Sequence, residues 1–201
     1  MSTSSSAAGT SRWLTVLGTL PVACAVVVAI NGLYMLLVAI GNITDFDTNY
    51  EFVKHVLSMD TTNFGQPAGQ GLDPNVMWRA ITNPTVHMIA YIAMIIWETI
   101  TAVILVAATG RWIGAIRRGS YDTVRALSTV GLLMILILFM GGFITIGGEW
   151  FQMWRSTAWN GLDPAFRNSV LAAFGLVLMY LPSRHWGAET PAGTEAASGG
   201  A

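Results

Sequence analysis

The sequence predicts an all-α, polytopic membrane protein: a bundle of four transmembrane helices with short interfacial helices in its outer loops. Apolar residues make up 53% of the chain and charged residues only 10%, whereas an average soluble domain has about 25% charged residues. The mean hydropathy is +0.55. Four segments are apolar over the roughly 20 residues that a helix needs to cross a bilayer. The lipid bilayer is therefore the expected environment.

The first predicted span covers residues 14–41. Its apolar run is much longer than the core of a signal peptide, about 7–15 residues, so an uncleaved helix is expected. Residues 1–12 are rich in Ser, Thr and Ala, which is typical of a disordered segment. Cys24 is the only cysteine, which excludes an internal disulfide and a cysteine-based zinc site.

The second predicted span, residues 84–109, has start and stop residues at its ends. Asn83 is a good N-cap, and Pro84 suits the first helical position because an N–H there would have no acceptor within the helix. Gly110 is the expected stop, because glycine readily takes the left-handed conformation that ends many helices.

The third and fourth predicted spans cover residues 124–147 and 164–182. The fourth opens at Asp163-Pro164, in the same way as the second, and is about 28 Å long. The tail over residues 187–201 is rich in Gly, Ala, Glu and Thr and is expected to be disordered. Residues 13–186 therefore form a single transmembrane domain.

Basic residues predict the orientation of the chain. Six lie on one side of the predicted membrane: Arg12, Arg111, Arg117, Arg118, Arg125 and Arg184. Four lie on the other side: Lys54, Arg79, Arg155 and Arg167. Because positive residues accumulate in cytoplasmic loops, both termini are predicted to be cytoplasmic. None of these clusters is dense enough to track phosphates, so nucleic acid is not an expected partner.

Two interfacial helices are predicted in the outer loops. Residues 48–51 read Thr-Asn-Tyr-Glu, a capping box, which predicts a helix to about Met59. Asp73-Pro74 predicts a second short helix containing Trp78. Both helices are expected to lie on the outer leaflet or to cap the bundle.

Two short motifs occur twice in the chain. Gly-Leu-Asp-Pro occupies residues 71–74 and 161–164, each time before a helix that runs inward. Met-Trp-Arg occupies residues 77–79 and 153–155, in the opposite order relative to the first motif. This mismatch favours independent helix starts over an internal duplication.

The second span contains a polar stripe. His87, Tyr91, Met94, Glu98 and Thr101 follow one another at intervals of four, three, four and three residues, and so share one helix face. Glu98 is expected near the middle of the span, where an ionisable side chain costs at least about 2.5–3.5 kcal/mol. It should therefore face the bundle interior and find a partner.

Asn31, in the first span, is the expected partner of Glu98, and Gly32 beside it would let another helix approach closely. The polar face is therefore predicted between the first two helices. Two interpretations of Glu98 remain open. It is either a carboxylate that handles a proton or a cation, or a structural hydrogen-bonding group that holds neighbouring helices together.

A second candidate site is expected at the outer face. Glu149 emerges there after a glycine-rich helix end, and is predicted to pair with Arg155 or Arg79. The site is either an ion-paired cap or a binding site for a ligand or partner.

Histidines suggest one further alternative. A haem bound between His55 and His87 is geometrically possible, although a lone histidine is usually a polar residue that is hydrogen-bonded within the protein. A metal site at the outer face is indicated equally weakly. No cofactor is therefore predicted. The chain has no nucleophile–base motif, phosphate-binding loop or zinc-protease signature, so no enzymatic activity is predicted.

Several loop motifs resemble a bacterial family of unknown function, whose members are described as predicted small integral membrane proteins. The motifs are at residues 42–47, 52–62, 77–81, 147–154 and 159–161. The resemblance covers roughly residues 13–182, and the chain departs from it at an insertion over residues 66–74 and in its polar tails. It implies a four-span protein of the bacterial inner membrane and no particular activity.

Three functions are therefore carried forward. The first is a non-enzymatic subunit or scaffold that packs against another membrane protein or a second copy of itself. The second is a small proton-coupled transporter that uses Glu98. The third is a haem-binding redox anchor in the membrane.

Overall fold

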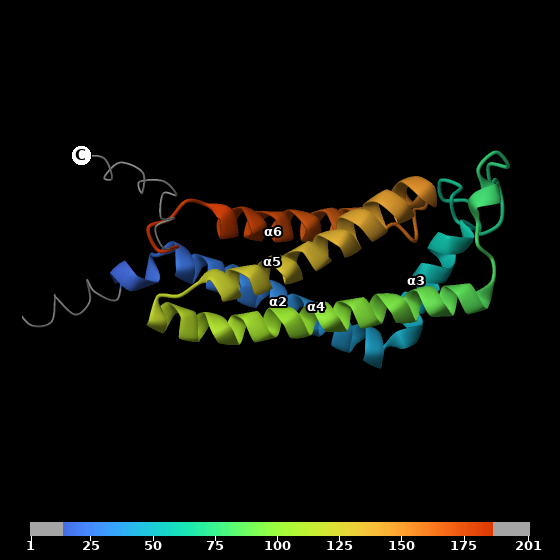
Figure 1. Ribbon diagram of the computed structural model, residues 1–201. Coiled ribbons are helices and arrows are strands. Elements are labelled where there is room, and N and C mark those ends of the chain that lie inside the picture. Colours follow the sequence, from blue (N-terminus) through green and yellow to red (C-terminus); the bar gives the residue numbers. More distant parts are fainter. Residues whose placement is uncertain (1–13, 187–201) are drawn as a thin grey trace, which may run out of the picture.

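The structure is a computed structural model that describes residues 14–186 (Figure 1). The expectations for residues 1–12 and 187–201 lie outside the described residues. The long helices are α2 (Leu20–Thr44), α4 (Pro84–Arg118), α5 (Asp122–Leu136), which continues into the π-helix η2 (Ile137–Trp150), and α6 (Leu162–Tyr180). The short ones are α3 (Phe46–Ser58) and the 3-10 helices η1 (Met77–Arg79) and η3 (Met153–Arg155).

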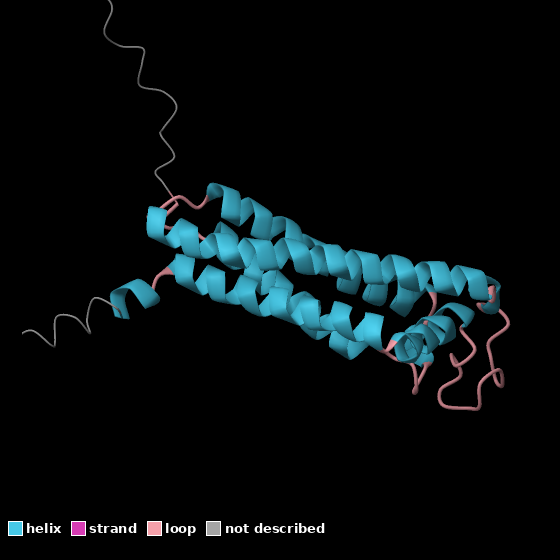
Figure 2. Cartoon of the chain, turned by 90° about the horizontal axis from the view of Figure 1, so that it is seen from below, coloured by secondary structure: helices cyan, strands magenta, loops and turns pink. Residues whose placement is uncertain are grey.

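The predicted fold class is confirmed. Within residues 14–186, four helical segments are long and apolar enough to cross a membrane. Figure 2 shows helices joined by loops, and no strand in the described part of the chain. The four segments lie side by side, with α3 and the longest loops at one end of the bundle, here called the α3 end (Figure 1). The other end, where the described chain starts and finishes, is called the terminal end.

The first span starts later than predicted. Residues 14–17 are helical, but the helix is interrupted at residues 18 and 19, and α2 begins at Leu20. Pro21 explains the new start, because proline lacks a backbone N–H and is best tolerated in the first turn of a helix. At its other end α2 runs to Thr44, and Asp45 alone separates it from α3.

The second span is longer than predicted. The predicted N-cap is confirmed, because Asn83 Oδ1 accepts the Thr85 N–H at 2.9 Å. The predicted stop at Gly110 is wrong: α4 continues to Arg118 and ends at Gly119, whose φ of +69° is the left-handed conformation that favours glycine. A glycine inside a helix costs only about 1 kcal/mol, which a helix of 35 residues tolerates.

The third and fourth spans also differ from their predicted limits. From Ile137 the third span is a π-helix. Within it, the Thr145 hydroxyl donates a hydrogen bond to the carbonyl of Met140, five residues earlier, at 2.9 Å. The fourth span begins at Leu162 and not at Pro164. Asp163 does not cap it, and its carboxylate instead pairs with Arg167 at 3.2 Å.

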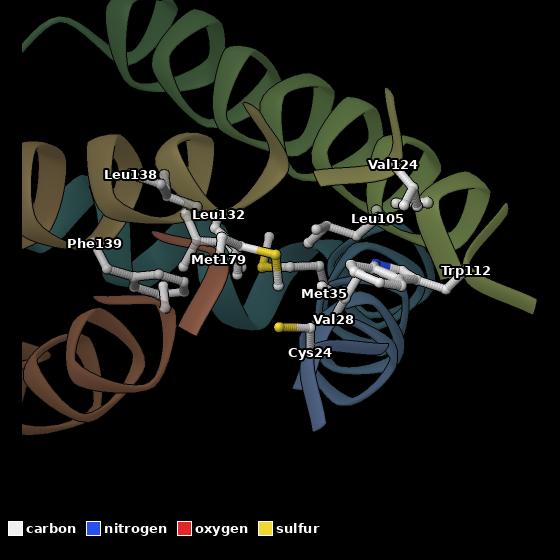
Figure 3. Packing of buried hydrophobic residues seen from close by; sticks show 14 of the residues in the cluster. Cys24, Val28, Met35, Leu105, Trp112, Val124, Leu132, Leu138, Phe139 and Met179 are labelled. Atoms are coloured by element: carbon white, nitrogen blue, oxygen red, sulfur yellow. The ribbon is translucent and has the colours of Figure 1, made fainter. Parts of the chain in front are cut away.

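The hydrophobic core takes side chains from all four spans (Figure 3). Fully buried members include Met35 on α2, Leu105 and Trp112 on α4, Leu132 on α5 and Met179 on α6. A Cβ atom at Gly32 would lie 3.1 Å from Leu105 Cβ and 3.2 Å from its backbone carbon, so α2 and α4 approach closely there, as small residues permit in membranes.

The interfacial helices differ in detail from the sequence predictions. α3 begins at Phe46, so the predicted capping box at residues 48–51 is wrong: Thr48 Oγ1 donates to Asp45 Oδ1 at 2.9 Å. The predicted helix after Asp73 is reduced to η1, a single 3-10 turn in which Trp78 is exposed. α3 packs against α4, and so covers the end of the bundle.

Candidate ligand-binding cavity

A chain of side-chain hydrogen bonds links α3, α2 and α4 at the α3 end. Asn49 Nδ2 on α3 donates to Asn42 Oδ1 on α2 at 2.6 Å. Asn42 Nδ2 in turn donates to Glu98 Oε2 on α4, also at 2.6 Å. Asn42 and Glu98 are 7% and 3% exposed, whereas Asn49 is exposed. Two amides therefore connect a buried carboxyl group to the surface.

Glu98 lies opposite the end of α2 that adjoins α3. Asn42, its partner, is two residues from the last residue of α2, so Glu98 is level with the last turn of that helix. α4 continues beyond Glu98 for 14 residues to Pro84, about 21 Å at the usual helical rise. The predicted position of this carboxyl group near the middle of the span stays a prediction, and its hydrogen-bonded path to the exposed Asn49 passes through Asn42 alone.

Tyr91 lies two turns further along the same face of α4. It is fully buried, and its hydroxyl donates to the backbone carbonyl of Asn42 at 3.3 Å. Its ring makes an edge contact with Phe46 at 4.7 Å and a tilted one with Tyr50 at 6.3 Å. Tyr91 therefore holds the junction of α2 and α3 against α4.

These groups line a cavity of about 440 Å³. Its polar and ionisable lining comprises Tyr34, Asn42, Asp45, Asn49, Tyr91 and Glu98, and no Lys, Arg or His contributes. The rings of Phe52, Phe139 and Phe143 complete an aromatic wall. The volume lies within the range of about 300–1,000 Å³ that small-molecule sites occupy.

Towards the terminal end the polar face stops. Thr101, Leu105, Ala108 and Trp112 follow Glu98 along this face of α4, and all four side chains are fully buried. The Thr101 hydroxyl donates to the carbonyl of Trp97 in its own helix at 2.7 Å. Glu98 is therefore the last ionisable group on this face, and a packed apolar core lies beyond it.

Three residues predicted at the intramembrane site do not join this hydrogen-bond chain. Asn31 is not the partner of Glu98, because its amide donates to the carbonyl of Val27 in its own helix at 2.9 Å. Thr101 likewise bonds within α4. His87 Nε2 donates to the Ile81 carbonyl at 2.7 Å, and its buried Nδ1 has no hydrogen-bond partner among the described residues.

The outer-face pairing is also different from the prediction. The exposed side chain of Glu149 forms no hydrogen bond or ion pair within residues 14–186. Arg155 instead pairs with Asp73 at 3.2 Å, and Arg79 donates to the Trp150 carbonyl at 3.3 Å. A backbone N–H from Asn75, followed by the Arg155 guanidinium, holds the pKa of Asp73 below its usual value.

Each arginine forms a cluster with aromatic rings. In the Arg79 cluster the guanidinium lies 5.4 Å from the Trp78 ring and 5.1 Å from the Trp150 ring. In the Arg155 cluster it lies 5.1 Å from Trp154 and 5.8 Å from Phe64. Cation–π contacts therefore surround both guanidinium groups, and neither group pairs with Glu149 as predicted.

His55 is occupied by acidic and aromatic neighbours. Its Nδ1 donates to Asp60 at 2.8 Å, and its ring stacks on Trp159 with centroids 4.7 Å apart. Within the described part of the chain, no three His, Cys, Asp or Glu side chains converge on a possible metal position. The proposed haem ligands, His55 and His87, therefore each have one ring nitrogen engaged by a protein group.

Two of the motifs that resemble a membrane family, at residues 42–47 and 147–154, thus lie beside the cavity and in the Arg79 cluster. A family model described as predicted small integral membrane protein (DUF2165) matches residues 20–182. The chain belongs to this family. The comparisons found no match among curated proteins and none among solved structures.

The matched region of this DUF2165 protein contains every residue that lines the cavity. Sequence reasoning nevertheless missed two residues of the hydrogen-bond chain, Asn42 and Asn49. A signal for Asn42 was present: it lies 11 residues, or three helical turns, after Asn31, and so on the same face of α2. Asn49 gave no such signal, because its position depends on how α3 folds back onto α2.

Proposed function

We propose that this DUF2165 protein is a small proton-coupled carrier that binds a cation at Glu98 from the α3 end of the bundle. The observation that supports this most directly is the position of Glu98, which is 3% exposed and lines a cavity whose lining contains no basic residue. The titratable groups that face it there are Asp45, Tyr34 and Tyr91.

The charge balance of the cavity favours exchange. An ionised carboxylate within a membrane costs at least about 2.5–3.5 kcal/mol, and either a proton or another cation removes that cost. When an ammonium ion binds, the Glu98 carboxyl loses its proton to the outer solution, so one positive charge replaces another. No bond other than the carboxyl O–H breaks.

Release on the other side requires a conformational change, because the core beyond Glu98 is closed by Leu105 and Trp112. The π-helix η2, which contributes Phe143 to the cavity, is a reasonable place for such a change. π-Helical geometry is less favourable than α-helical geometry and is frequent at functional sites.

The test measures protons released from purified protein in lipid nanodiscs, in weak buffer with a pH indicator, on addition of methylammonium chloride. The wild-type protein should release up to one proton per chain, and Glu98→Gln should release none. Glu149→Gln, which alters an exposed glutamate outside the cavity, is the matched control. Equal release from Glu98→Gln and the wild type, or no release from the wild type, contradicts the proposal.

The orientation follows the arginine distribution, with the terminal end in the cytoplasm of a bacterial inner membrane and the α3 end outside. A reporter that is active only in the cytoplasm should work when fused after Arg118 and fail when fused after Gly65. The reverse result would make the cavity open inward.

A second candidate function, a subunit or scaffold of a membrane complex, is favoured by the arginine–aromatic clusters. Phe64, Trp78, Trp150 and Trp154 are 68%, 69%, 47% and 44% exposed, and Trp and Arg are the residues most enriched at interface hot spots. A photo-crosslinker at position 78 should form a protein adduct in native membranes, whereas one at Ile113, exposed on the surface of α4, should not. The mass of the adduct distinguishes a second copy from another protein.

A further inference from the structure

A second, apolar pocket lies next to the Glu98 cavity. Its volume is about 130 Å³, and it lies between α3, α4 and η2. Val56, Ala90, Leu138, Gly142 and Ile146 are among the residues that line it, and every lining residue is apolar. An apolar protein cavity of about 150 Å³ is large enough to take up benzene, so this pocket has the size of a small ring or short alkyl chain.

The two spaces share a wall. Phe52, Val53, Met94 and Phe143 line both the polar cavity and the apolar pocket. The rings of Phe52 and Phe143 stack on each other in this shared wall, with centroids 6.1 Å apart and planes inclined by 26°. A single ligand can therefore reach both spaces if these two side chains separate or if the ligand passes beside them.

The chemistry of the two spaces is complementary. The cavity offers one buried carboxyl group and the faces of aromatic rings, including Tyr34 and Tyr91, which together attract an ammonium group by charge and by cation–π interaction. The pocket offers only apolar surface. A phospholipid is a poor match, because no basic side chain lines the cavity to pair with its phosphate.

We propose that the ligand of this site is an amphiphilic amine, a molecule with one ammonium group and an apolar body of about six carbons. The ammonium group binds Glu98, and the apolar body occupies the pocket behind Phe52 and Phe143. This inference rests on the proposed function, and adds to it the class of substrate.

The pocket can be filled without touching the carboxyl group. Gly142 lines the pocket, and a Cβ atom there would have its nearest neighbour, the Ile137 carbonyl oxygen, 3.9 Å away. Gly142→Leu therefore adds a side chain to the open space. Gly141, the preceding residue, does not line the pocket and has nothing within 4 Å of its Cβ position, so Gly141→Leu is the matched control.

The experiment measures the dissociation constants of methylammonium, propylammonium and hexylammonium for the protein in nanodiscs, each corrected with the Glu98→Gln variant. The wild type and Gly141→Leu should bind about fourfold more tightly per added methylene, as expected from apolar burial. Gly142→Leu should bind methylammonium normally and lose this dependence on chain length. Ala90→Leu, which fills the same pocket from α4, replaces Gly142→Leu if that variant does not fold.

The outcomes separate the two proposals. If methylammonium binds through Glu98 but chain length has no effect in the wild type, or the pocket-filled variant keeps the full effect, the amphiphilic amine is wrong and the carrier proposal stands. If none of the three amines binds through Glu98, the carrier proposal fails and this inference fails with it.

Discussion

At the terminal end of the bundle, Trp112 and Met179 are fully buried among neighbours from all four spans. At the α3 end, the same helices α2 and α4 enclose an open cavity and are joined by Asn42 and Glu98. The first region is held by close packing of apolar side chains and small residues, the second by polar groups around an empty volume. A bundle can form a site only where its packing is relaxed, so stability and function are expected to separate along its length.

The largest effect is expected in the packed half. Gly32→Leu should lower the free energy of unfolding by about 1–3 kcal/mol, because its side chain would meet the backbone of Leu105 at 3.2 Å. Denaturation with sodium dodecyl sulfate in bicelles measures this change. Gly110→Leu, at a helical glycine with nothing within 4 Å of its Cβ position, is the control and should not destabilise the protein. Equal losses of unfolding free energy in the two variants would show that the close packing at Gly32 does not stabilise the protein.

A smaller effect is expected from Glu98 itself. Glu98→Leu should cost on the order of 1–2 kcal/mol, since it removes an interhelical hydrogen bond and leaves the Asn42 amide without its acceptor. Glu98→Gln retains an acceptor oxygen and should preserve stability in the same denaturation assay. If the Glu98→Gln protein folds and still exchanges protons for amines, the carboxyl group has only a structural role.

The two asparagines of α2 provide a comparison within one helix. Asn42→Leu should cost about 0.6–1.7 kcal/mol, because Asn42 bonds both α3 and α4. Asn31→Leu should change the free energy of unfolding less, because its amide bonds only its own helix. The reverse order would return Asn31 to the role that the sequence first assigned to it.

The smallest effect concerns pH and the outer loops. The pKa of Asp73 is lowered on folding, so its contribution to stability is fully present above its unfolded value of about 3.8. It should be lost as the pH falls through the lower folded pKa. The protection of amide hydrogens in the loop around Asp73, measured relative to their intrinsic exchange rates at each pH, should therefore fall below pH 3.8, and Asp73→Asn should remove this dependence. Because the carboxylate is solvent-accessible, the rest of the protein should not change.

Much of the fold was readable from the sequence, because span length, hydropathy and the Asn83 cap are local properties. The face shared by Tyr91 and Glu98 was also predictable from helical spacing. Which residue on the facing helix meets Glu98 was not, since it depends on how α2 crosses α4. The crossing is set by contacts such as Gly32 with Leu105, and these shift the partner from Asn31 to Asn42.

The outer face was less predictable for a different reason. A basic residue near Glu149 suggested an ion pair, but a guanidinium can also stack on aromatic faces and donate to carbonyl groups. Both Met-Trp-Arg segments use this option: each forms one 3-10 turn, and each arginine packs on the preceding tryptophan. The order of the motifs in the sequence did not favour an internal duplication. The two Met-Trp-Arg segments nevertheless adopt the same local structure.

Only one residue separates α2 from α3, so a change in the position of one helix would act directly on the other. This residue is Asp45, and the hydrogen bond from Asn49 on α3 to Asn42 on α2 spans it. If α3 moved away from the bundle, either that hydrogen bond would break and leave the Asn42 oxygen without its donor, or Asn42 would move with α3 and its amide would shift relative to Glu98. Displacement of α3 would thus take one hydrogen-bond partner from the same Asn42 side chain that holds Glu98.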